Sequence, residues 1–170
     1  MIFNTHVKFK IKKKLFRLSR LSISSIKKEY ILSLSNSKYL KYKRKHTLKS
    51  QKSYIKKINS SLDNFILGIY TNNKLVGSMN AQTYKKIDIG NKKLYNTVSF
   101  GILIFEKYQK KNIGKNSVKI FSRFLSKTYN NIFSTIDERN VPSINAFKYA
   151  NFRKMTYKKG KTLFFLYKKK

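Results

Sequence analysis

The balance of charge is the feature of this sequence that most constrains what it can fold into. Its 170 residues include 40 Lys and Arg but only 6 Asp and Glu, which gives a formal net charge of +34. Repulsion among so many cations opposes a compact state, so a stable fold must place the cations at the surface and bury a substantial apolar core. The composition allows such a core, because 41% of the residues are hydrophobic and 15% are aromatic. We therefore expect a single folded domain covering residues 1–170.

Several classes of protein are excluded by what the chain lacks. It has no Cys, so it has no disulfide framework, no thiolate nucleophile and no Cys-ligated zinc, and its two His residues cannot make a His-rich metal site. No apolar run of about 18 residues exists, so we expect no membrane span. The first residues lack the apolar segment of a secretory signal. The expected location is cytoplasmic.

The positive charge has two interpretations. A cationic protein has affinity for polyanions, which indicates nucleic-acid or phosphate binding. The lysines are nevertheless spread from Lys8 to Lys170 instead of forming one basic stripe, and the abundance of Lys, Asn, Ile, Tyr and Phe is typical of an AT-rich genome. This spread favours a solvated lysine coat over a dedicated nucleic-acid interface.

The first half of the chain predicts helices followed by a hairpin. The expected elements are an extended opening over Val7 to Leu18, a helix capped by Ser22, Ser24 or Ser25 and ending at Asn36, a charged connector over Tyr39 to His46, and a helix capped by Thr47 or Ser50. A β-prone run from Asn64 to Thr71 then turns at Asn72 and Asn73 and returns over Lys74 to Gln82.

The second half predicts strands that alternate with helices. The expected elements are a polar stretch around Asp88, Gly90 and Asn91, a strand from Tyr95 to Phe105, a helix from Lys115 to about Thr128, a strand from Asn131 to Asp137, a helix from Pro142 to Ala150, and a hairpin of Phe152–Tyr157 with Thr162–Tyr167. The predicted class is therefore α/β, in the order β-α-α-β-β-β-α-β-α-β-β.

The junction from Ser99 to Lys115 carries the strongest chemical signal. A strand runs into Gln109–Gly114 (QKKNIG) and then into a helix, and backbone N–H groups at such a helix start favour a bound phosphate. Lys110, Lys111 and Lys115 add positive charge there. The segment matches neither the Walker pattern nor the dinucleotide-binding glycine pattern.

Two segments together resemble the GNAT superfamily of acetyl-CoA-dependent N-acetyltransferases. Gln109–Gly114 is similar to the pyrophosphate-loop pattern [RQ]-x-x-G-x-[GA], with Asn112 in place of the first glycine. Asn140–Phe152 is similar to the later pattern N-x-x-S-I-x-x-Y/F-x-K-x-G-F, with Asn151 in place of glycine. The resemblance covers nearly the whole chain. Three further segments resemble the subgroup of ribosomal-protein and nucleotide-sugar acetyltransferases: Phe16–Leu18, Asn36–Leu40 and Thr47–Gln51.

The resemblance implies a fold and a cofactor site. The fold is a mixed, mostly antiparallel central sheet flanked by helices, in which two adjacent strands splay apart. The pantetheine arm of acetyl-CoA then pairs with the strand edge at Ile102, Leu103 and Ile104, and Asn140 hydrogen-bonds this arm. The pyrophosphate lies over Gln109, Lys110, Lys111, Asn112, Ile113, Gly114 and Lys115. Asn112 can adopt the left-handed backbone conformation that the missing glycine requires. No metal is implied.

The resemblance also implies direct attack of a neutral amine on the thioester, with a base and an acid to move protons. The family often has Tyr as the acid where this chain has Phe147, which leaves Ser143, Tyr149 or water for that task. The candidate bases are Glu106 and Asp137, with Glu138 also near. The alternatives are that Glu106 and Glu138 pair with lysines and that Asp137 caps the following helix.

The acceptor is expected to be a small molecule with a primary amine. The connector from Tyr39 to His46 is cationic and carries two aromatic rings, so Tyr39, Arg44 and His46 are candidate acceptor contacts. This connector favours an anionic acceptor such as a nucleotide-linked amino sugar over the N-terminus of a ribosomal protein. The alternative class is a non-catalytic basic protein that binds RNA on a degenerate scaffold of the same fold. We expect a monomer or homodimer, with non-specific nucleic-acid affinity from the charge.

Overall fold

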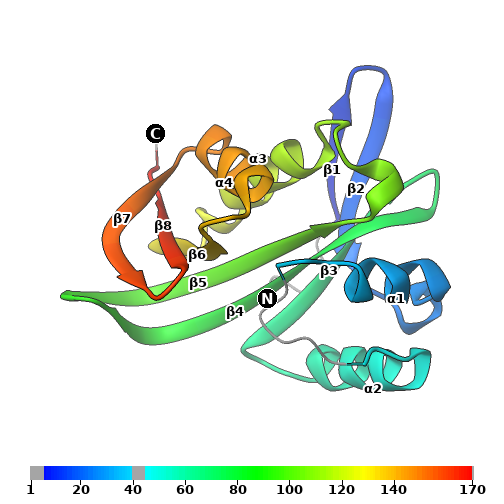
Figure 1. Cartoon of the computed structure of the whole chain (residues 1–170), viewed down its shortest axis with the longest axis horizontal. Helices are drawn as coiled ribbons and strands as arrows, with labels where there is room; N and C mark the ends of the chain where they lie inside the picture. Colours follow the sequence, from blue (N-terminus) through cyan, green and yellow to red (C-terminus); the bar gives the residue numbers. More distant parts are fainter. Residues whose placement is uncertain (1–5, 40–44, 170) are drawn as a thin grey trace. The chain divides into compact units, whose positions relative to one another are not determined.

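The computed structural model describes residues 6–39 and 45–169, and its elements appear in Figure 1. Eight strands form one sheet: β1 (Val7–Ile11), β2 (Lys14–Arg20), β3 (Asn64–Thr71), β4 (Lys74–Ile89), β5 (Lys92–Ile104), β6 (Asn131–Asp137), β7 (Phe152–Lys159) and β8 (Thr162–Tyr167). The helices are α1 (Lys28–Ser35), α2 (Leu48–Asn59), α3 (Ile113–Leu125) and α4 (Val141–Tyr149), with short 3-10 turns η2 (Ile23–Ser25) and η3 (Glu106–Tyr108).

The strand order in the sheet is β1-β2-β3-β4-β5-β6-β8-β7. Strand β6 pairs in parallel with β5 and antiparallel with β8, and the β1–β2, β2–β3 and β7–β8 pairs are antiparallel. The expected class, a mixed and mostly antiparallel sheet with flanking helices, is confirmed.

The chain divides into two compact units. The first unit comprises Met1–Asn80 and Ile102–Ile113, and the second comprises Ala81–Gly101 and Gly114–Lys170. Strands β4 and β5 each contribute residues to both. Whether residues 1–170 act as one domain stays a prediction.

In the first unit, helices α1 and α2 contribute to a core with strand residues. This core consists of Leu21, Ile26, Tyr30, Ile55, Ile66, Tyr70 and Phe105. The Tyr30 ring meets the Phe105 ring edge-on with centroids 6.0 Å apart, which ties α1 to the residue that follows β5. Burial raises the pKa of Tyr30 to about 12, so its phenol stays neutral at physiological pH.

In the second unit, helices α3 and α4 bury aromatic rings against the sheet. Phe100 of β5 contacts Phe121 of α3, Phe147 of α4 and Phe152 of β7, with ring centroids 5.1, 5.3 and 5.9 Å apart. A second cluster is built on buried Ile89, Leu94 and Phe133.

The expected element boundaries need correction at several places. The strand expected from Tyr95 to Phe105 is β5, which begins at Lys92 and ends at Ile104, and the strand expected over Phe152–Tyr157 is β7, which ends at Lys159. The opening from Val7 to Leu18 is a hairpin of β1 and β2, because Lys12 turns the chain with a φ of 53° and no Gly or Pro signals it. The strand expected over Lys74 to Gln82 continues to Ile89, so the polar stretch is only the tip of a long hairpin that turns at Gly90. The helix expected from Ser22 begins as η2, which Ser22 caps, and α1 starts at Lys28. Helix α3 covers Ile113–Leu125 instead of Lys115 to Thr128.

Other local predictions are confirmed. Asn72 and Asn73 form the predicted turn, both with positive φ, and Thr47 and Ser50 form a reciprocal capping box at the start of α2. Among the described residues, the positive-φ positions that are not glycine are Lys12, Asn72, Asn73, Asn96, Lys110, Asn112 and Asn151. Asparagine therefore supplies most of the left-handed turns in a chain that has only 6 Gly.

Candidate functional site

The end of β5 is a strand edge with little pairing to β6. The parallel register covers only Thr97–Ser99 with Asn131–Phe133. Strand β5 then continues to Ile104 and β6 to Asp137, while β6 takes up β8 as its antiparallel partner. Residues Ile102, Leu103 and Ile104 are half-buried. Among the described residues, the register of β5 with β6 thus ends at Ser99, five residues before β5 itself ends at Ile104.

The loop that follows β5 has an unusual backbone. Phe105 N–H donates to the Val76 carbonyl oxygen at 3.0 Å, η3 follows, and Gln109–Asn112 lead into α3. Asn112 has a φ of 61°, so the expectation that it adopts the left-handed conformation is confirmed. Lys110 has a φ of 57°, which the sequence did not predict. A non-glycine residue at positive φ is uncommon, and this loop has two in three residues.

Side chains fix this loop to the end of β5. Gln109 Nε2 donates to the Ile104 carbonyl oxygen at 3.1 Å, and Lys111 Nζ donates to the Lys107 carbonyl oxygen at 2.8 Å. The ammonium groups of Lys107 and Lys111 lie 5.2 and 5.7 Å from the centre of the Tyr108 ring. Residues Gln109–Asn112 of the predicted loop are therefore held in one braced turn with exposed cations, and the other three predicted residues, Ile113, Gly114 and Lys115, begin α3.

Glu106 lines a cavity of about 340 Å³. The other lining residues are Glu29, Leu32, Ser33 and Asn36 on the α1 side, and Phe105 and Lys107. Lys107 forms an ion pair with Glu29, and this hydrogen-bonded partner raises the pKa of Lys107. Glu106 is exposed. Two of the chain's 6 acidic residues thus line one small cavity next to the end of β5.

The junction between β6 and α4 is organised differently. Asn140 is the N-cap of α4, and its side-chain oxygen accepts a hydrogen bond from the Ser143 backbone N–H at 3.2 Å. Pro142 occupies the first turn, where its missing N–H does no harm. Ser143 is half-buried, and it is the Ser143 backbone N–H, not the hydroxyl, that makes the hydrogen bond to Asn140.

Phe147 occupies the position at which the resembled pattern often has Tyr. Its side chain is 1% exposed, and its ring lies 4.9 Å from Phe152 and 5.3 Å from Phe100. The residue therefore serves as a core residue of the second unit and offers no proton.

Tyr149 and Lys115 lie together. The ammonium groups of Lys115 and Lys119 lie 4.9 and 5.1 Å from the centre of the Tyr149 ring, within cation–π range. Helices α3 and α4 thus bring one predicted catalytic residue beside one predicted cofactor contact. Lys119 was not singled out from the sequence, although it lies one helical turn after Lys115.

The carboxylates after β6 are both paired. Arg139 donates to Asp137 from its Nε at 2.9 Å and from Nη2 at 2.8 Å, and these hydrogen bonds lower the pKa of Asp137 to about 2. A base works best with a pKa near the operating pH, so Asp137 is poorly suited to that role. The alternative that Asp137 caps α4 is wrong, because Asn140 does so. Glu138 pairs with Lys158 at 3.0 Å, as the alternative for that residue predicted.

Of the three expected acceptor contacts, Tyr39 and His46 lie among the described residues. Tyr39 is 39% exposed, and His46 is half-buried with its Nδ1 3.1 Å from Gln51 Nε2. Arg44 lies outside the described residues, as does most of the cationic connector.

No group of acidic or His residues in the described part of the chain can hold a metal ion. No helix among these residues is long and apolar enough to cross a membrane.

Comparison by sequence finds no matching protein family and no matching curated protein. Comparison of structures does find similar folds. The chain is similar to Mycobacterium smegmatis RimJ in complex with CoA-disulfide (TM-score 0.74, 11% identity, covering 96% of this chain and 87% of that one). It is also similar to the GNAT domain of S. lividans PAT (TM-score 0.71, 8% identity, 95% and 96% covered).

A third similar structure is the aminoglycoside acetyltransferase AAC(6')-Ib in complex with coenzyme A and kanamycin (TM-score 0.70, 14% identity, 89% and 93% covered). At these identities the likeness establishes the fold alone. The chain therefore has the fold of the GNAT acetyltransferases, as the sequence resemblance predicted.

Proposed function

We propose that the protein is an N-acetyltransferase that moves the acetyl group of acetyl-CoA to a primary amine. The observation that carries this proposal is the braced loop after β5, with left-handed backbone at Lys110 and Asn112 just before the first turn of α3. Such a turn directs backbone N–H groups toward an anion. The lysines of the loop supply the matching charge for a pyrophosphate.

The strand edge of β5 supports the position of the pantetheine arm. The register of β5 with β6 stops at Ser99, so the amide-bearing arm can pair with the backbone at Ile102–Ile104 as an added strand. In the proposed reaction the amine nitrogen attacks the thioester carbon, a new C–N bond forms, and the C–S bond breaks. A backbone N–H of this edge is suited to stabilise the oxyanion that forms between these two steps.

Glu106 is the base that the geometry supports best. It is exposed in its cavity, whereas Asp137 and Glu138 are held by Arg139 and Lys158. In the proposed reaction Glu106 takes the proton of the incoming ammonium group, directly or through a water. The departing thiolate is protonated by the Ser143 hydroxyl, by the Tyr149 phenol or by water. The group that gives this proton regains one from the nitrogen of the intermediate, which loses its second proton as the C–S bond breaks.

Two features point to different acceptors. The cationic connector near Tyr39 and His46 favours an anionic acceptor, which is the basis of the proposed nucleotide-linked amino sugar. The subgroup resemblance also allows the N-terminus of a ribosomal protein. The cavity that Glu106 lines favours a cationic amine such as a polyamine, because the Glu106 carboxylate attracts an ammonium group, whereas Glu29 is already paired with Lys107. Thiol release from acetyl-CoA with UDP-amino sugars, polyamines and short peptides distinguishes the three.

A matched pair of variants at Asn112 tests the cofactor site. Asn112→Gly keeps the left-handed backbone accessible and should bind acetyl-CoA at least as well as the wild type in calorimetry. Asn112→Val strongly disfavours a φ of 61° and should weaken binding by about tenfold or more. Equal affinities for the two variants would contradict the loop assignment. No acetyl-CoA binding to the wild type would favour the non-catalytic, RNA-binding alternative.

A further inference from the structure

One face of the sheet in the second unit carries a cluster of aromatic and aliphatic side chains to which neither α3 nor α4 contributes a residue. Around buried Ile89, Leu94 and Phe133 lie the partly buried Tyr84, Ile87, Met155, Tyr157, Phe164 and Leu166. The rings contact one another, since Tyr84 and Phe164 lie 5.8 and 6.5 Å from Phe133. The aromatic cluster around Phe100, against which α3 and α4 pack, is made of other residues.

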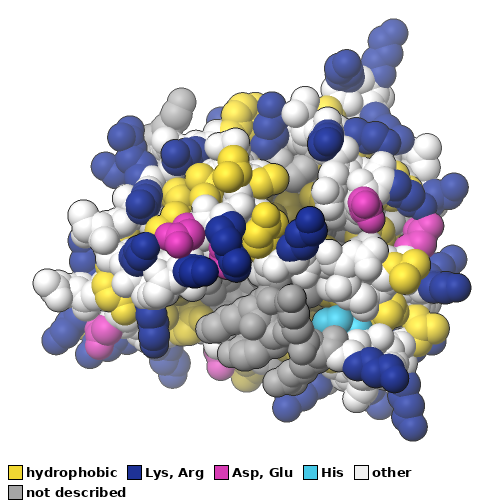
Figure 2. Space-filling view, in the orientation of Figure 1, with side chains coloured by type: hydrophobic (Ala, Val, Ile, Leu, Met, Phe, Trp, Pro, Cys, Tyr) yellow, Lys and Arg dark blue, Asp and Glu magenta, His cyan; other side chains and the backbone are white. Residues whose placement is uncertain are grey.

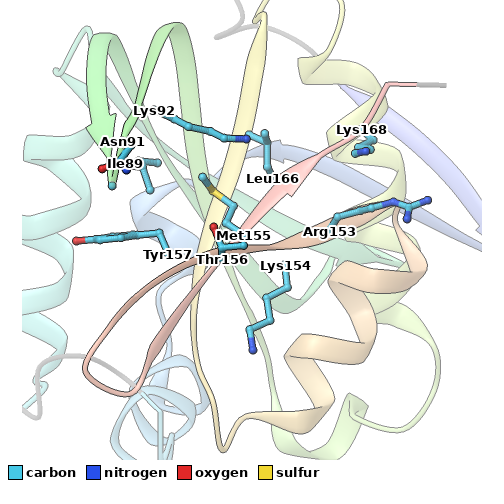
Figure 3. A pocket seen from close by; sticks show the side chains of 11 residues that line it. Ile89, Asn91, Lys92, Arg153, Lys154, Met155, Thr156, Tyr157, Leu166 and Lys168 are labelled. Carbon is cyan, nitrogen blue, oxygen red and sulfur yellow. The ribbon is translucent and has the colours of Figure 1, made fainter.

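This face contains a cavity of about 410 Å³, shown in Figure 3. Its lining comes from the tip of the β4–β5 hairpin and from β7 and the end of β8: Ile89, Gly90, Asn91, Lys92, Arg153, Lys154, Met155, Thr156, Tyr157, Leu166 and Lys168. The floor is therefore apolar and aromatic, and the rim is cationic.

The charge on the rim has a single sign. Lys92, Arg153, Lys154 and Lys168 line the cavity and no carboxylate does. All four are exposed, and none forms an ion pair with a described carboxylate. In Figure 3, Lys92 extends toward Leu166. Arg153 and Lys168 lie together at the right of the view, on the other side of Leu166 from Tyr157. A ligand seated on this floor meets several unpaired cations at once.

Tyr157 is a rigid part of the floor. A Cβ built on Gly90 would lie 2.9 Å from the Tyr157 Cδ2, so the ring lies directly against the glycine backbone. Gly90 has a φ of 57°, which a larger residue would disfavour as well. The ring also contacts Phe164, with centroids 5.0 Å apart. The orientation of this ring is thus fixed before any ligand arrives.

We propose that this cavity, with Tyr157 as its ring and Lys92, Arg153 and Lys168 on its rim, binds single-stranded RNA. A base lies against the apolar and aromatic floor, and the neighbouring phosphates contact the rim cations. Aromatic platforms with flanking cations are the general means by which proteins hold single strands without sequence preference. The proposal assigns a binding role to some of the cations that make up the net charge of +34. It does not rest on acetyl transfer.

The surroundings of the cavity favour a strand over a free nucleotide. Further exposed lysines follow the same hairpin and the β7–β8 turn, namely Lys85, Lys86, Lys93, Lys159 and Lys161. One nucleotide cannot reach all these charges, whereas consecutive phosphates of a strand can. A second copy of the chain is a poor occupant, because two molecules of net charge +34 repel each other.

The test is fluorescence anisotropy with a labelled 12-residue oligouridylate, in the absence of acetyl-CoA. The double variant Lys92→Gln with Arg153→Gln should weaken binding about tenfold or more and reduce the slope of log K against log salt concentration by about 1.4, since each phosphate contact to a single strand contributes about 0.7. The matched control is Lys49→Gln with Lys52→Gln on the exposed side of α2, which removes the same charge. The control should change the affinity less than about twofold.

Tyr157→Leu tests the floor separately. It should weaken binding by on the order of tenfold, while Tyr157→Phe should retain it, with thermal melts confirming that both variants fold. Equal losses of affinity in the Lys92/Arg153 and Lys49/Lys52 double variants would overturn the proposal in favour of a diffuse cationic coat. Uridine monophosphate binding as tightly as the oligonucleotide would make the cavity a nucleotide site. Binding to phosphatidylserine vesicles but not to RNA would make it a lipid contact.

Discussion

Two junctions of this chain, β6–α4 and β5–α3, both lead from a strand into a helix, but they differ in what their polar groups contact. Between β6 and α4, the chain's own side chains occupy the polar groups: Asn140 caps the helix, and Arg139 holds Asp137. Between β5 and α3, the loop has exposed lysines and a left-handed backbone at Lys110 and Asn112. Its side-chain hydrogen bonds, from Gln109 and Lys111, go to backbone carbonyl oxygens that precede the loop. The first arrangement serves stability and the second is suited to an external anion.

The cationic surface does not by itself reveal this difference. Figure 2 shows Lys and Arg side chains scattered over the visible face and only a few Asp and Glu among them. Charge is abundant in many places on this surface, so a cluster of lysines indicates a site only together with a second feature, such as the backbone conformation of a loop or an aromatic floor. The backbone conformation after β5 is the more specific signal.

The largest effect is expected from Gly114→Asp in the first turn of α3. A carboxylate at a helix start is favourable for the helix, so the melting temperature should stay close to that of the wild type. The same carboxylate repels a bound pyrophosphate by about 4 kcal/mol per charge pair at about 4 Å in a dielectric of about 20. Acetyl-CoA binding in calorimetry should fall by at least about a hundredfold. Gly114→Ala is the control, and unchanged affinity of the Asp variant would remove the contrast between the junctions.

Ser143→Ala should lower kcat by about a hundredfold if its hydroxyl protonates the thiolate. The cap of α4 uses the Ser143 backbone N–H, so removing the hydroxyl leaves the cap intact. Turnover at saturating acetyl-CoA measures the effect, and Ser143→Thr is the matched control. A fully active Ala variant would assign the whole β6–α4 junction to stability.

Asn140→Ala should cost about 1 kcal/mol of the free energy of unfolding through the lost cap. Chemical denaturation measures this cost, and Asn140→Ser should restore most of it. Calorimetry on the same variants separates the two roles of Asn140. A weaker affinity for acetyl-CoA in the Ser variant, despite restored stability, would support its predicted contact with the pantetheine arm. Unchanged affinity in both would leave it as a cap only.

The smallest effect is expected in acid. The folded-state pKa of Asp137, about 2, lies below its ordinary value of 3.8. The Asp137–Arg139 pair therefore stabilises the fold above about pH 4, and this contribution is lost as the pH falls toward 2. The melting temperature of the wild type should fall as the pH is lowered from about 4 toward 2, and this fall should be smaller in Arg139→Gln, which lacks the pair. Lys158→Gln is the control. The same slope in Arg139→Gln and the wild type would show that the pair contributes nothing.

Much of the fold could be predicted from the sequence, because its signals are local. The capping residues Thr47 and Ser50, the Asn72-Asn73 turn and Pro142 all mark element boundaries by chemistry within a few positions. The β1–β2 hairpin was missed because Lys12, which turns it, has no intrinsic preference for positive φ. The end of β4 was missed because its last residues are mostly exposed or half-buried, so the sequence shows no clear alternation of apolar and polar positions there.

The candidate site was less predictable, since its chemistry depends on contacts distant in sequence. Glu29 and Glu106 line one cavity although they lie 77 positions apart in the sequence. The pairing of Asp137 with Arg139 lowers the carboxyl pKa, and no residue pattern alone shows which neighbour turns toward it. Conversely, the left-handed Asn112 followed directly from the gap in a glycine pattern.

The asparagines at left-handed positions bear on how the ancestry of such a chain can be traced. Glycine codons begin with two guanines and asparagine codons with two adenines, so drift toward A and T exchanges one residue for the other. At Asn112 and Asn151, where the resembled patterns have glycine, the backbone has a positive φ of 61° and 70°, which glycine readily adopts. A sequence pattern that requires glycine does not match these two positions. For a chain of this composition, backbone dihedral angles can therefore agree with a pattern where the residue types do not, and comparison of structures finds similar folds where comparison of sequences finds no match.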